Sequence, residues 1–478
     1  MTLTMNPDLI TGDEIAFRED NQQLITLPRN ATYSGVVKIL EAKRQEQEIV
    51  ADFRRQFNYR PNDGAVATAI VLRARYGLVM GKSTATMFGS RPPEVLEVPV
   101  GPGGATVQAP WGCIQIPVID GGDVYLDDTE HRDYGTIFEI MVRAKRMYAK
   151  EVEAFFADVA EQLRTASIYR GKAVAGADEL TFIEGLDRFD PDQIVFAAGV
   201  QQSLDAALFG PLRHPQAYRS ENIPLKRAVL LYGPYGTGKT SIGMMLATEA
   251  VAAGWTFIMA RPGRDRVEDV LTTARLYAPA VVWVEDVDTD TGHTNPKAVS
   301  AMLDAFDGIT AKSGEIIVAM STNHIAKVPP GMLRPGRLDY VLEIAALDRD
   351  ATEKLIRVVV TAGKLAADVD FDAVYTEMRG FLPAFVRATA DRARSFAIHR
   401  TGGTGYVLTT EDLIGAARSL HPQLRLHQGA TETPPMPTLD RVVANLVTAG
   451  AHGMRLVRGP SEYRLEQPAE LARNGMAT

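Results

Sequence analysis

The sequence predicts an α/β protein: a central parallel sheet crossed by helices, a helical subdomain after it and an α+β region before it. Three observations support this. Apolar β-like runs alternate with helical segments from about residue 190 to 343, which is typical of parallel strands joined by crossover helices. Residues 349–420 show only helical periodicity, and residues 65–125 mix short β-like runs with Gly/Pro turns.

Composition limits the classes of function. The 478 residues carry a net charge of −8, with 51 Lys+Arg against 59 Asp+Glu, so the chain lacks the basic surplus typical of a duplex-binding protein. The single cysteine, Cys113, excludes an intramolecular disulfide and fits a reducing compartment. No stretch approaches the roughly 18 apolar residues of a membrane span, and the N-terminus does not resemble a signal peptide. We therefore expect a cytoplasmic protein without membrane contact.

Five regions follow from the order of the patterns. Apolar residues at helical spacing predict helices over residues 33–57 and 136–168, a break near residues 61–64, and a linker over residues 171–190. The regions are a loose arm (1–30), an α+β domain that is a candidate for substrate handling (31–175), a large α/β subdomain (176–346), a helical subdomain (347–426) and a tail (427–478).

The clearest motif lies at residues 229–241, VLLYGPYGTGKTS. An apolar strand, a glycine-rich loop ending in Lys-Thr and a following helix form the G-x-x-x-x-G-K-[ST] phosphate loop in its required context. Its glycines let backbone N–H groups point at phosphate oxygens, and the helix N-terminus favours negative charge. We expect the lysine to reach the β- and γ-phosphates of ATP and Thr240 to ligate Mg²⁺. The loop residues are Gly233, Pro234, Tyr235, Gly236, Thr237, Gly238, Lys239, Thr240 and Ser241.

The second predicted buried strand after the phosphate-loop strand lies in APAVVWVEDVD at residues 278–288, and it ends in carboxylates. Such a strand beside the phosphate-loop strand delivers acidic side chains to Mg²⁺ and the attacking water. By position, Glu285 takes the metal-side role and Asp286 polarises water, an inversion of the common Asp-Glu order. We expect Asp288 to be structural. The inversion predicts either slower hydrolysis or a compensating backbone shift.

Two further motifs follow. The apolar strand IIVAMSTN ends at Asn323, whose amide can hold the attacking water or report the γ-phosphate. The segment PPGMLRPGRLD then places Arg334 and Arg337 three residues apart, a spacing that lets two guanidinium groups project together and stabilise transferred phosphoryl charge across a subunit boundary.

With these motifs in order, residues 191–420 resemble an AAA+ ATPase of the AAA subfamily. The resemblance includes GPLRHPQAYRSENIPLKRAVLLYGPYGTGKT, ARLYAPAVVWVEDVD and STNHIAKVPPGMLRPGRLD. It implies a RecA-like P-loop sheet with a helical lid, hydrolysis of ATP to ADP and phosphate, and a homo-oligomeric ring, usually a hexamer. It also implies that the arginines act on the neighbouring subunit's ATP, and that Ala198, Gly199 and Ala384 bracket the adenine.

Two departures narrow the resemblance. The strand at residues 255–260 runs straight into RPGRDRVEDVL, a short segment without the aromatic pore loop of threading members. Three features are similar to the mitochondrial complex III assembly chaperone branch, which moves folded substrate. They are this shortening, the Glu-Asp order and the segment IYRGKAV at residues 168–174. The family's Gly-Ala pair at the lid is Pro383-Ala384 here.

Three hypotheses about function remain open. The first is an ATP-driven protein remodeller or chaperone acting on an unknown protein substrate. The second is a nucleic-acid-associated ATPase, in which RPGRDR (261–266) places basic groups at the ring pore. The third is a slow, nucleotide-gated assembly scaffold, which the Glu285-Asp286 order motivates.

Overall fold

The structure is a computed structural model. It describes residues 32–77, 93–116, 122–287, 315–403 and 405–431, except residues 329 and 334–336, and the short stretches 4–5, 14–18, 24–28, 81, 83–86, 89–91, 455–458 and 463–466. Backbone contacts divide the chain into two compact units. The first is Met1–Val358 with Leu382–Ala384, and the second is Val359–Phe381 with Phe385–Thr478.

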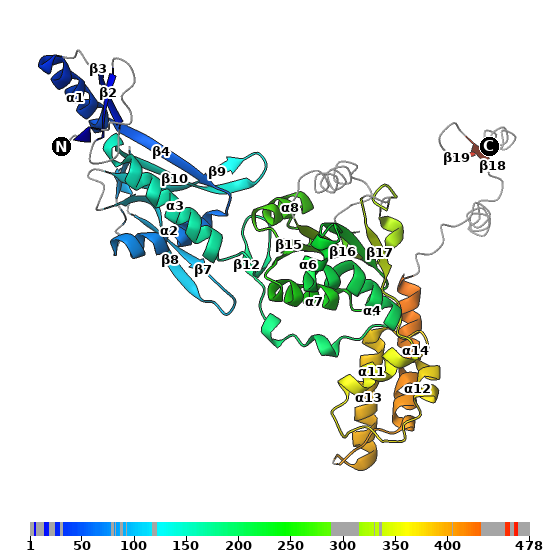
Figure 1. Cartoon of the computed structure of the whole chain (residues 1–478). Helices are drawn as coiled ribbons and strands as arrows, with labels where there is room; N and C mark the ends of the chain where they lie inside the picture. Colours follow the sequence, from blue (N-terminus) through cyan, green and yellow to red (C-terminus); the bar gives the residue numbers. More distant parts are fainter. Residues whose placement is uncertain are drawn as a thin grey trace. The chain divides into compact units, whose positions relative to one another are not determined.

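A seven-stranded sheet forms the larger α/β part of the first unit, with β12, β15, β16 and β17 labelled in Figure 1. Its strand order is β12-β11-β14-β15-β16-β13-β17. All neighbours run parallel except β12, which is antiparallel to β11. This confirms the predicted parallel sheet. The strands are β11 (Ala173–Ala175), β12 (Thr181–Phe182), β13 (Arg227–Tyr232), β14 (Thr256–Ala260), β15 (Ala280–Val284), β16 (Ile316–Thr322) and β17 (Tyr340–Glu343).

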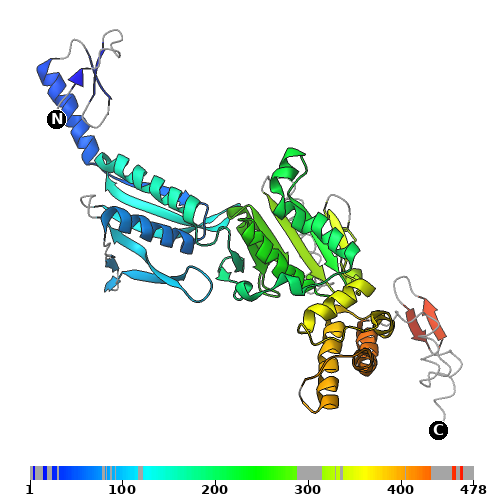
Figure 2. The same cartoon turned by 60° about the horizontal axis from the view of Figure 1, so that its bottom comes forward.

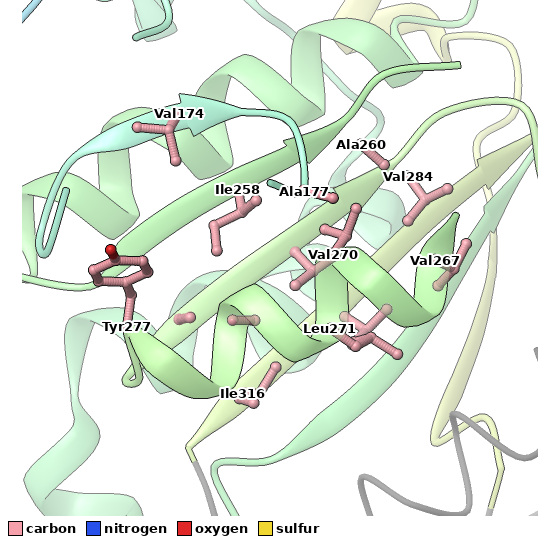
Figure 3. Packing of buried hydrophobic residues seen from close by; sticks show 14 of the residues in the cluster. Val174, Ala177, Ile258, Ala260, Val267, Val270, Leu271, Tyr277, Val284 and Ile316 are labelled. Carbon is pink, nitrogen blue, oxygen red and sulfur yellow. The ribbon is translucent and has the colours of Figure 1, made fainter. Parts of the chain in front are cut away.

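Helices cover both faces of this sheet. On one face, Val270 and Leu271 of α8 (Val267–Leu276) pack with Ile258 of β14 and Val284 of β15 (Figure 3). The other face packs against α7 and the helical turns before β13, in a second apolar cluster. These elements are α4 (Ala198–Leu204), a π-helical turn (Asp205–Phe209), α5 (Gly210–Arg213), α6 (Pro215–Ser220) and α7 (Lys239–Ala252).

One correction concerns residues 171–190, which the sequence predicts as a linker. Residues 173–175 instead form β11, which is buried and pairs with β14, and residues 181–182 form β12. A strand of three small or β-branched residues, Ala-Val-Ala, is too short to give a periodicity signal. Its place depends on pairing with residues 257–259, far along the chain.

The N-terminal sheet domain, defined here as residues 50–166, contains a five-stranded antiparallel sheet in the order β4-β10-β9-β8-β7. Two helices pack on one face of it, and their apolar residues share a cluster with the inward-facing strand residues. The strands are β4 (Val50–Phe57), β7 (Glu94–Pro99), β8 (Thr106–Gln115), β9 (Asp123–His131) and β10 (Gly135–Lys145), and the helices are α2 (Pro61–Tyr76) and α3 (Ala149–Ala166). The side chain of Cys113 is buried in this domain.

The two long helices predicted for this region, over residues 33–57 and 136–168, are each helical over only part of their length. Helix α1 (Tyr33–Glu48) ends where β4 begins, and β10 occupies the first part of the expected helix over residues 136–168. In β10 the residues buried at every second position are Phe138, Ile140, Val142 and Ala144, which is the period of a strand. The expected break near residues 61–64 is also wrong, because Pro61 stands in the first turn of α2, where a proline is tolerated.

Smaller sheets complete the first unit and the tail. Within residues 1–30, expected as a loose arm, the backbone forms β1 (Thr4–Met5), β2 (Glu14–Arg18) and β3 (Leu24–Pro28) as an antiparallel sheet. Two antiparallel pairs are β5 (Thr84–Thr86) with β6 (Gly89–Arg91), and β18 (Arg455–Arg458) with β19 (Tyr463–Glu466). Most of the predicted tail lies outside the described residues.

The region predicted as helical over residues 349–420 forms helices, seen in yellow to orange in Figure 2. The first of them belongs to the first unit up to Val358, and the others belong to the second unit except at Pro383 and Ala384. The side chain of Asp370 caps the second of them by accepting hydrogen bonds from the N–H groups of Asp372 and Ala373. The helices are α11 (Arg349–Val359), α12 (Phe371–Met378), α13 (Pro383–Thr401) and α14 (Thr410–Thr431). Among the described residues, no helix combines the length and apolar character that a membrane span needs.

Candidate ATP-binding site

The sheet topology gathers the predicted site residues at one edge. Strand β16 lies between β15 and β13, and all three are parallel, so their carboxyl ends meet at the same edge. The phosphate loop follows β13, Glu285 and Asp286 follow β15, and Asn323 follows β16. Ligands of open α/β sheets bind at this edge.

The phosphate loop is shaped by its glycines. Gly236 and Gly238 have φ angles of 89° and 96°, which residues other than glycine rarely adopt. Gly238 immediately precedes the first residue of α7. A Cβ atom on Gly233 would lie 2.4 Å from the carbonyl oxygen of Ile344. The loop therefore needs glycine at three positions, and it directs the N-terminus of a 14-residue helix toward its own concave side.

Lys239 is held across this loop. Its side chain is only 7% exposed, and Nζ donates hydrogen bonds to the carbonyl oxygens of Gly233 at 2.6 Å and Pro234 at 3.0 Å. The hydroxyl of Thr237 donates to the same Pro234 carbonyl at 3.0 Å. The ammonium group is thus fixed at the loop rather than extended into solvent, while Thr240 on the next position is exposed.

The acidic pair is connected to the predicted sensor. The Nδ2 group of Asn323 donates a 2.6 Å hydrogen bond to Oδ1 of Asp286. The backbone N–H of Asp286 donates to the hydroxyl of Ser321 at 3.3 Å, and the backbone of Asp286 is left-handed, with φ of 48°. Glu285 and Asp286 are both half-buried. The structure therefore brings Asp286 and Asn323 into direct contact from two neighbouring strands.

Three nearby residues were missed by sequence reasoning. Ser321 is one of two buried hydroxyl residues, with Thr322, that end the apolar strand β16, and this change from apolar to polar residues was the available signal. His324 pairs edge to face with the half-exposed ring of Tyr235, with centroids 6.0 Å apart, so the loop tip contacts the residue after the sensor. Phe196 lies beside Gly238, where an added Cβ would be 3.7 Å from its ring.

The expected adenine residues lie at both sides of the loop. Ala198 and Gly199 are exposed at the start of α4, two and three residues after Phe196. The N–H of Ala384 donates to the carbonyl oxygen of Gly236 at 3.2 Å. Arg337 is described and half-buried, whereas Arg334 and Asp288 lie outside the described residues.

The donor set suits a nucleotide with magnesium. Protein sites usually bind Mg²⁺ through one or two oxygen ligands and the phosphates of the substrate. Thr240 and Glu285 supply such oxygens, and the glycine cradle with Lys239 supplies donors for phosphate. Within the part of the chain that the structure describes, no group of three or more His, Cys, Asp or Glu side chains forms a separate metal site.

Together, the parallel sheet, the phosphate loop and the carboxylates at the strand ends define a P-loop nucleotide-hydrolase domain. Residues 229–346 match the family model described as "ATPase family associated with various cellular activities (AAA)", so this part of the chain is an AAA-family ATPase domain.

Curated relatives agree with this assignment. The chain is 29% identical over 204 residues to the "Cell division cycle protein 48 homolog" of Archaeoglobus fulgidus, covering 40% of this chain and 28% of that protein. It is 30% identical over 206 residues to "ATP-dependent zinc metalloprotease FtsH 3" of Sphaerobacter thermophilus, covering 40% and 42%. It is 29% identical over 208 residues to the "Proteasome-activating nucleotidase" of Methanocaldococcus jannaschii, covering 39% and 47%. The chain therefore spans less than half the length of these relatives.

Proposed function

We propose that this protein hydrolyses ATP in a homo-oligomeric ring and uses the energy to remodel a protein substrate. The observation that carries the proposal is the meeting of phosphate loop, acidic pair and Asn323 at one edge of the sheet, with Asn323 bonded to Asp286 at 2.6 Å. The AAA match and relatives named as a nucleotidase and as ATP-dependent enzymes support it.

Each residue then has a role in the hydrolysis. Lys239 and the loop N–H groups bind the phosphates, and Asp286 polarises the water that attacks the γ-phosphorus, giving ADP and phosphate. Asn323 orients the Asp286 carboxylate. Thr240 and Glu285 would hold Mg²⁺, which neutralises charge on the β- and γ-phosphates. Arg334 and Arg337 would stabilise the same charge on the ATP of the neighbouring subunit. Ala198, Gly199 and Ala384 would bracket the adenine of the ATP bound at their own phosphate loop.

The test is ATP turnover by the purified protein. We expect turnover on the order of 1 s⁻¹, an ordinary enzyme value. Lys239→Ala should abolish it by removing the phosphate-binding charge, and Asp286→Asn should abolish it while sparing ATP binding. The matched control is Lys150→Ala, an exposed lysine of the N-terminal sheet domain. Turnover that survives Lys239→Ala would refute the proposal, and turnover below about one per minute with ATP-dependent assembly would favour the scaffold.

The short segment after β14 favours a remodeller that does not thread its substrate. Only residues 261–266 separate β14 from α8, and none of them is aromatic. The carboxylate of Asp265 accepts hydrogen bonds from the backbone N–H, Nε and Nη2 of Arg261 at 2.7–2.9 Å, which ties this segment to itself. Together with the Glu285-Asp286 order, this supports a place near the complex III assembly chaperone branch.

Nucleic-acid binding is the second candidate, because Arg264 and Arg266 in this segment have side chains 68% and 71% exposed. Each has an acidic neighbour, Glu179 at 3.9 Å and Glu268 at 3.3 Å, which reduces the local positive charge. Salt-dependent DNA binding that Arg264→Glu with Arg266→Glu weakens would favour this candidate over protein remodelling.

A further inference from the structure

Besides its own core, the N-terminal sheet domain contributes buried apolar residues to a cluster of the ATPase sheet. One cluster of buried hydrophobic residues contains Val66 of α2 and Ile137 of β10 together with Val270, Leu271 and Tyr277 at α8. Figure 3 shows the ATPase side of this cluster. Apolar residues of both parts therefore pack together across the boundary, which opposes free movement of one part on the other.

At the centre of this boundary lies a buried arginine. The side chain of Arg60, the residue before α2, is only 2% exposed. On its own side, Nη1 donates to the carbonyl oxygen of Thr136 at 2.8 Å. Across the boundary, Nη2 donates to the carbonyl oxygen of Ala177 at 3.0 Å and to the hydroxyl of Thr273, and it forms an ion pair with Asp178 at 3.1 Å.

A second set of polar contacts surrounds Tyr277, which is fully buried at the end of α8. The backbone N–H of Arg60 donates to the Tyr277 hydroxyl at 3.0 Å. In the first turn of α2, Asp63 is 1% exposed and accepts hydrogen bonds from the hydroxyl of Ser167 at 2.6 Å and the N–H of Ile168 at 3.0 Å. We call Arg60, Asp63, Ala177, Asp178, Thr273 and Tyr277 the Arg60 junction.

Such a junction favours one relative position of the two sheets. A buried polar group that loses its hydrogen-bond partner is destabilising, and more so when it is charged, so a displacement that breaks these hydrogen bonds is opposed. An Arg with planar, fixed donors to several acceptors constrains direction as well as distance. The two sheets therefore should move together or separate in a discrete step.

The junction attaches to the part of the ATPase core that leads to the acidic pair. Thr273 and Tyr277 lie at the end of α8, and the chain then enters β15, which ends at Val284 directly before Glu285 and Asp286. Strand β15 is buried along its whole length between β14 and β16. A rigid strand of this kind carries displacement from one end to the other.

We propose that the Arg60 junction fixes the N-terminal sheet domain to α8 and β15 as one mechanical body, and that it transmits nucleotide-dependent movement of the acidic pair to α2. The fixing rests on contacts alone, whereas the transmission rests on the ATPase function proposed above. Arg60 acts here as a positioning residue that contacts neither nucleotide nor the acidic pair.

The test compares wild type with Arg60→Met and Thr273→Val in the full chain. Calorimetry should show the N-terminal sheet domain and the ATPase core unfolding in one transition in wild type and in two in the variants. Hydrogen–deuterium exchange, with and without a non-hydrolysable ATP analogue and Mg²⁺, should show nucleotide-dependent protection of residues 57–72 in wild type. The variants should lose that protection but keep nucleotide protection of the phosphate loop at residues 229–245.

The control is Arg54→Met on β4, whose side chain is 63% exposed and 3.7 Å from Glu139, and it should behave as wild type. Thr273→Val keeps the shape of the side chain, so it remains informative if Arg60→Met does not fold. A single transition in the variants overturns the fixing. The transmission is overturned if nucleotide protects the phosphate loop but not residues 57–72 in wild type. It is also overturned if the variants keep nucleotide-dependent protection of both segments. Absence of phosphate-loop protection in wild type refutes the proposed function, and calorimetry then decides the junction alone.

Discussion

Asp286 is one of two non-glycine residues with a positive φ among the described residues, and the other is Asn222. Asp and Asn are enriched in this left-handed conformation, because a short polar side chain can bond locally. The Asp286 carboxylate also accepts a hydrogen bond from Asn323, which follows the neighbouring strand β16. This gives a physical reason for aspartate rather than glutamate at the second position of the acidic pair.

The first prediction at this scale concerns the inverted order. Exchanging the pair (Glu285→Asp with Asp286→Glu) should lower stability by up to about 1 kcal/mol, because glutamate is less tolerant of the left-handed backbone. It should not raise turnover, since the Asn323 contact is fitted to the shorter carboxylate. Thermal unfolding and ATP turnover measure both effects. Faster hydrolysis by the exchanged protein would show that the order itself limits the rate.

The second prediction at the residue scale concerns the dependence of stability on pH. Burial raises the pKa of Asp63 to about 6, against the opposing hydrogen bonds of Ser167, Ile168 and Tyr277 and the charge of Arg170. The unfolded value is about 3.9, so the folded protein binds more protons between these values, and stability falls as pH rises through about 6. Between pH 5 and pH 7 this group should remove about 1 kcal/mol of stability.

Denaturant unfolding of wild type and Asp63→Asn at pH 5 and pH 7 measures the difference. The asparagine variant cannot titrate at this position, so its stability should change less across the interval, whatever its absolute value. An equal pH dependence in the two proteins would exclude Asp63 as the responsible group.

At the scale of elements, the ATPase sheet followed from the sequence, whereas in the N-terminal sheet the β-like region around β7 and β8 was predicted and strands β4 and β10 were not. Strands such as β15 are short apolar runs between breakers, and a parallel sheet buried on both faces produces that pattern. In residues 136–144, however, Ile137, Ile140, Met141 and Ala144 also fit helical spacing. The deciding fact is the pairing of Phe138 with Phe57, which no local pattern contains.

The candidate site was predictable for a similar reason. Its residues follow directly after strands, and parallel strands bring their carboxyl ends together, so order along the chain located Lys239, Glu285, Asp286 and Asn323. The bond between Asp286 and Asn323 and the left-handed backbone depend on how two strand ends lie in space. Those details required the structure.

One element-level prediction follows from the contact of α7 with β15. A Cβ atom on Gly243 of α7 would lie 2.6 Å from the Trp283 ring, so Gly243→Ala should force the helix outward. Overpacking of this kind costs about 1–3 kcal/mol, which exceeds the roughly 1 kcal/mol that alanine gains over glycine in a helix. Thermal unfolding should therefore show a loss of stability.

The matched control is Gly415→Ala in α14, where the nearest atom to an added Cβ is 3.8 Å away, an ordinary contact. That variant should gain stability through helix propensity. If Gly243→Ala were as stable as wild type, the close packing of α7 on β15 would be wrong.

At the scale of the whole molecule, the ring proposal makes a prediction about mixtures. Arg334→Ala should bind ATP without hydrolysing it, because a guanidinium group from one subunit is expected to stabilise phosphoryl charge on the next. Mixing it with Lys239→Ala should restore part of the turnover, since some interfaces then combine an intact arginine with an intact phosphate loop. Mixed rings that form but stay inactive would count against action between subunits.

The apolar cluster shared by the two sheets has a consequence for how such a chain can change. Excision after residue 175 would remove β11 from the ATPase sheet and leave the surface of α8 uncovered. The N-terminal sheet domain therefore cannot be exchanged between ATPases as an independent unit. Any lineage that acquires a new version must also adapt the α8 surface beneath it.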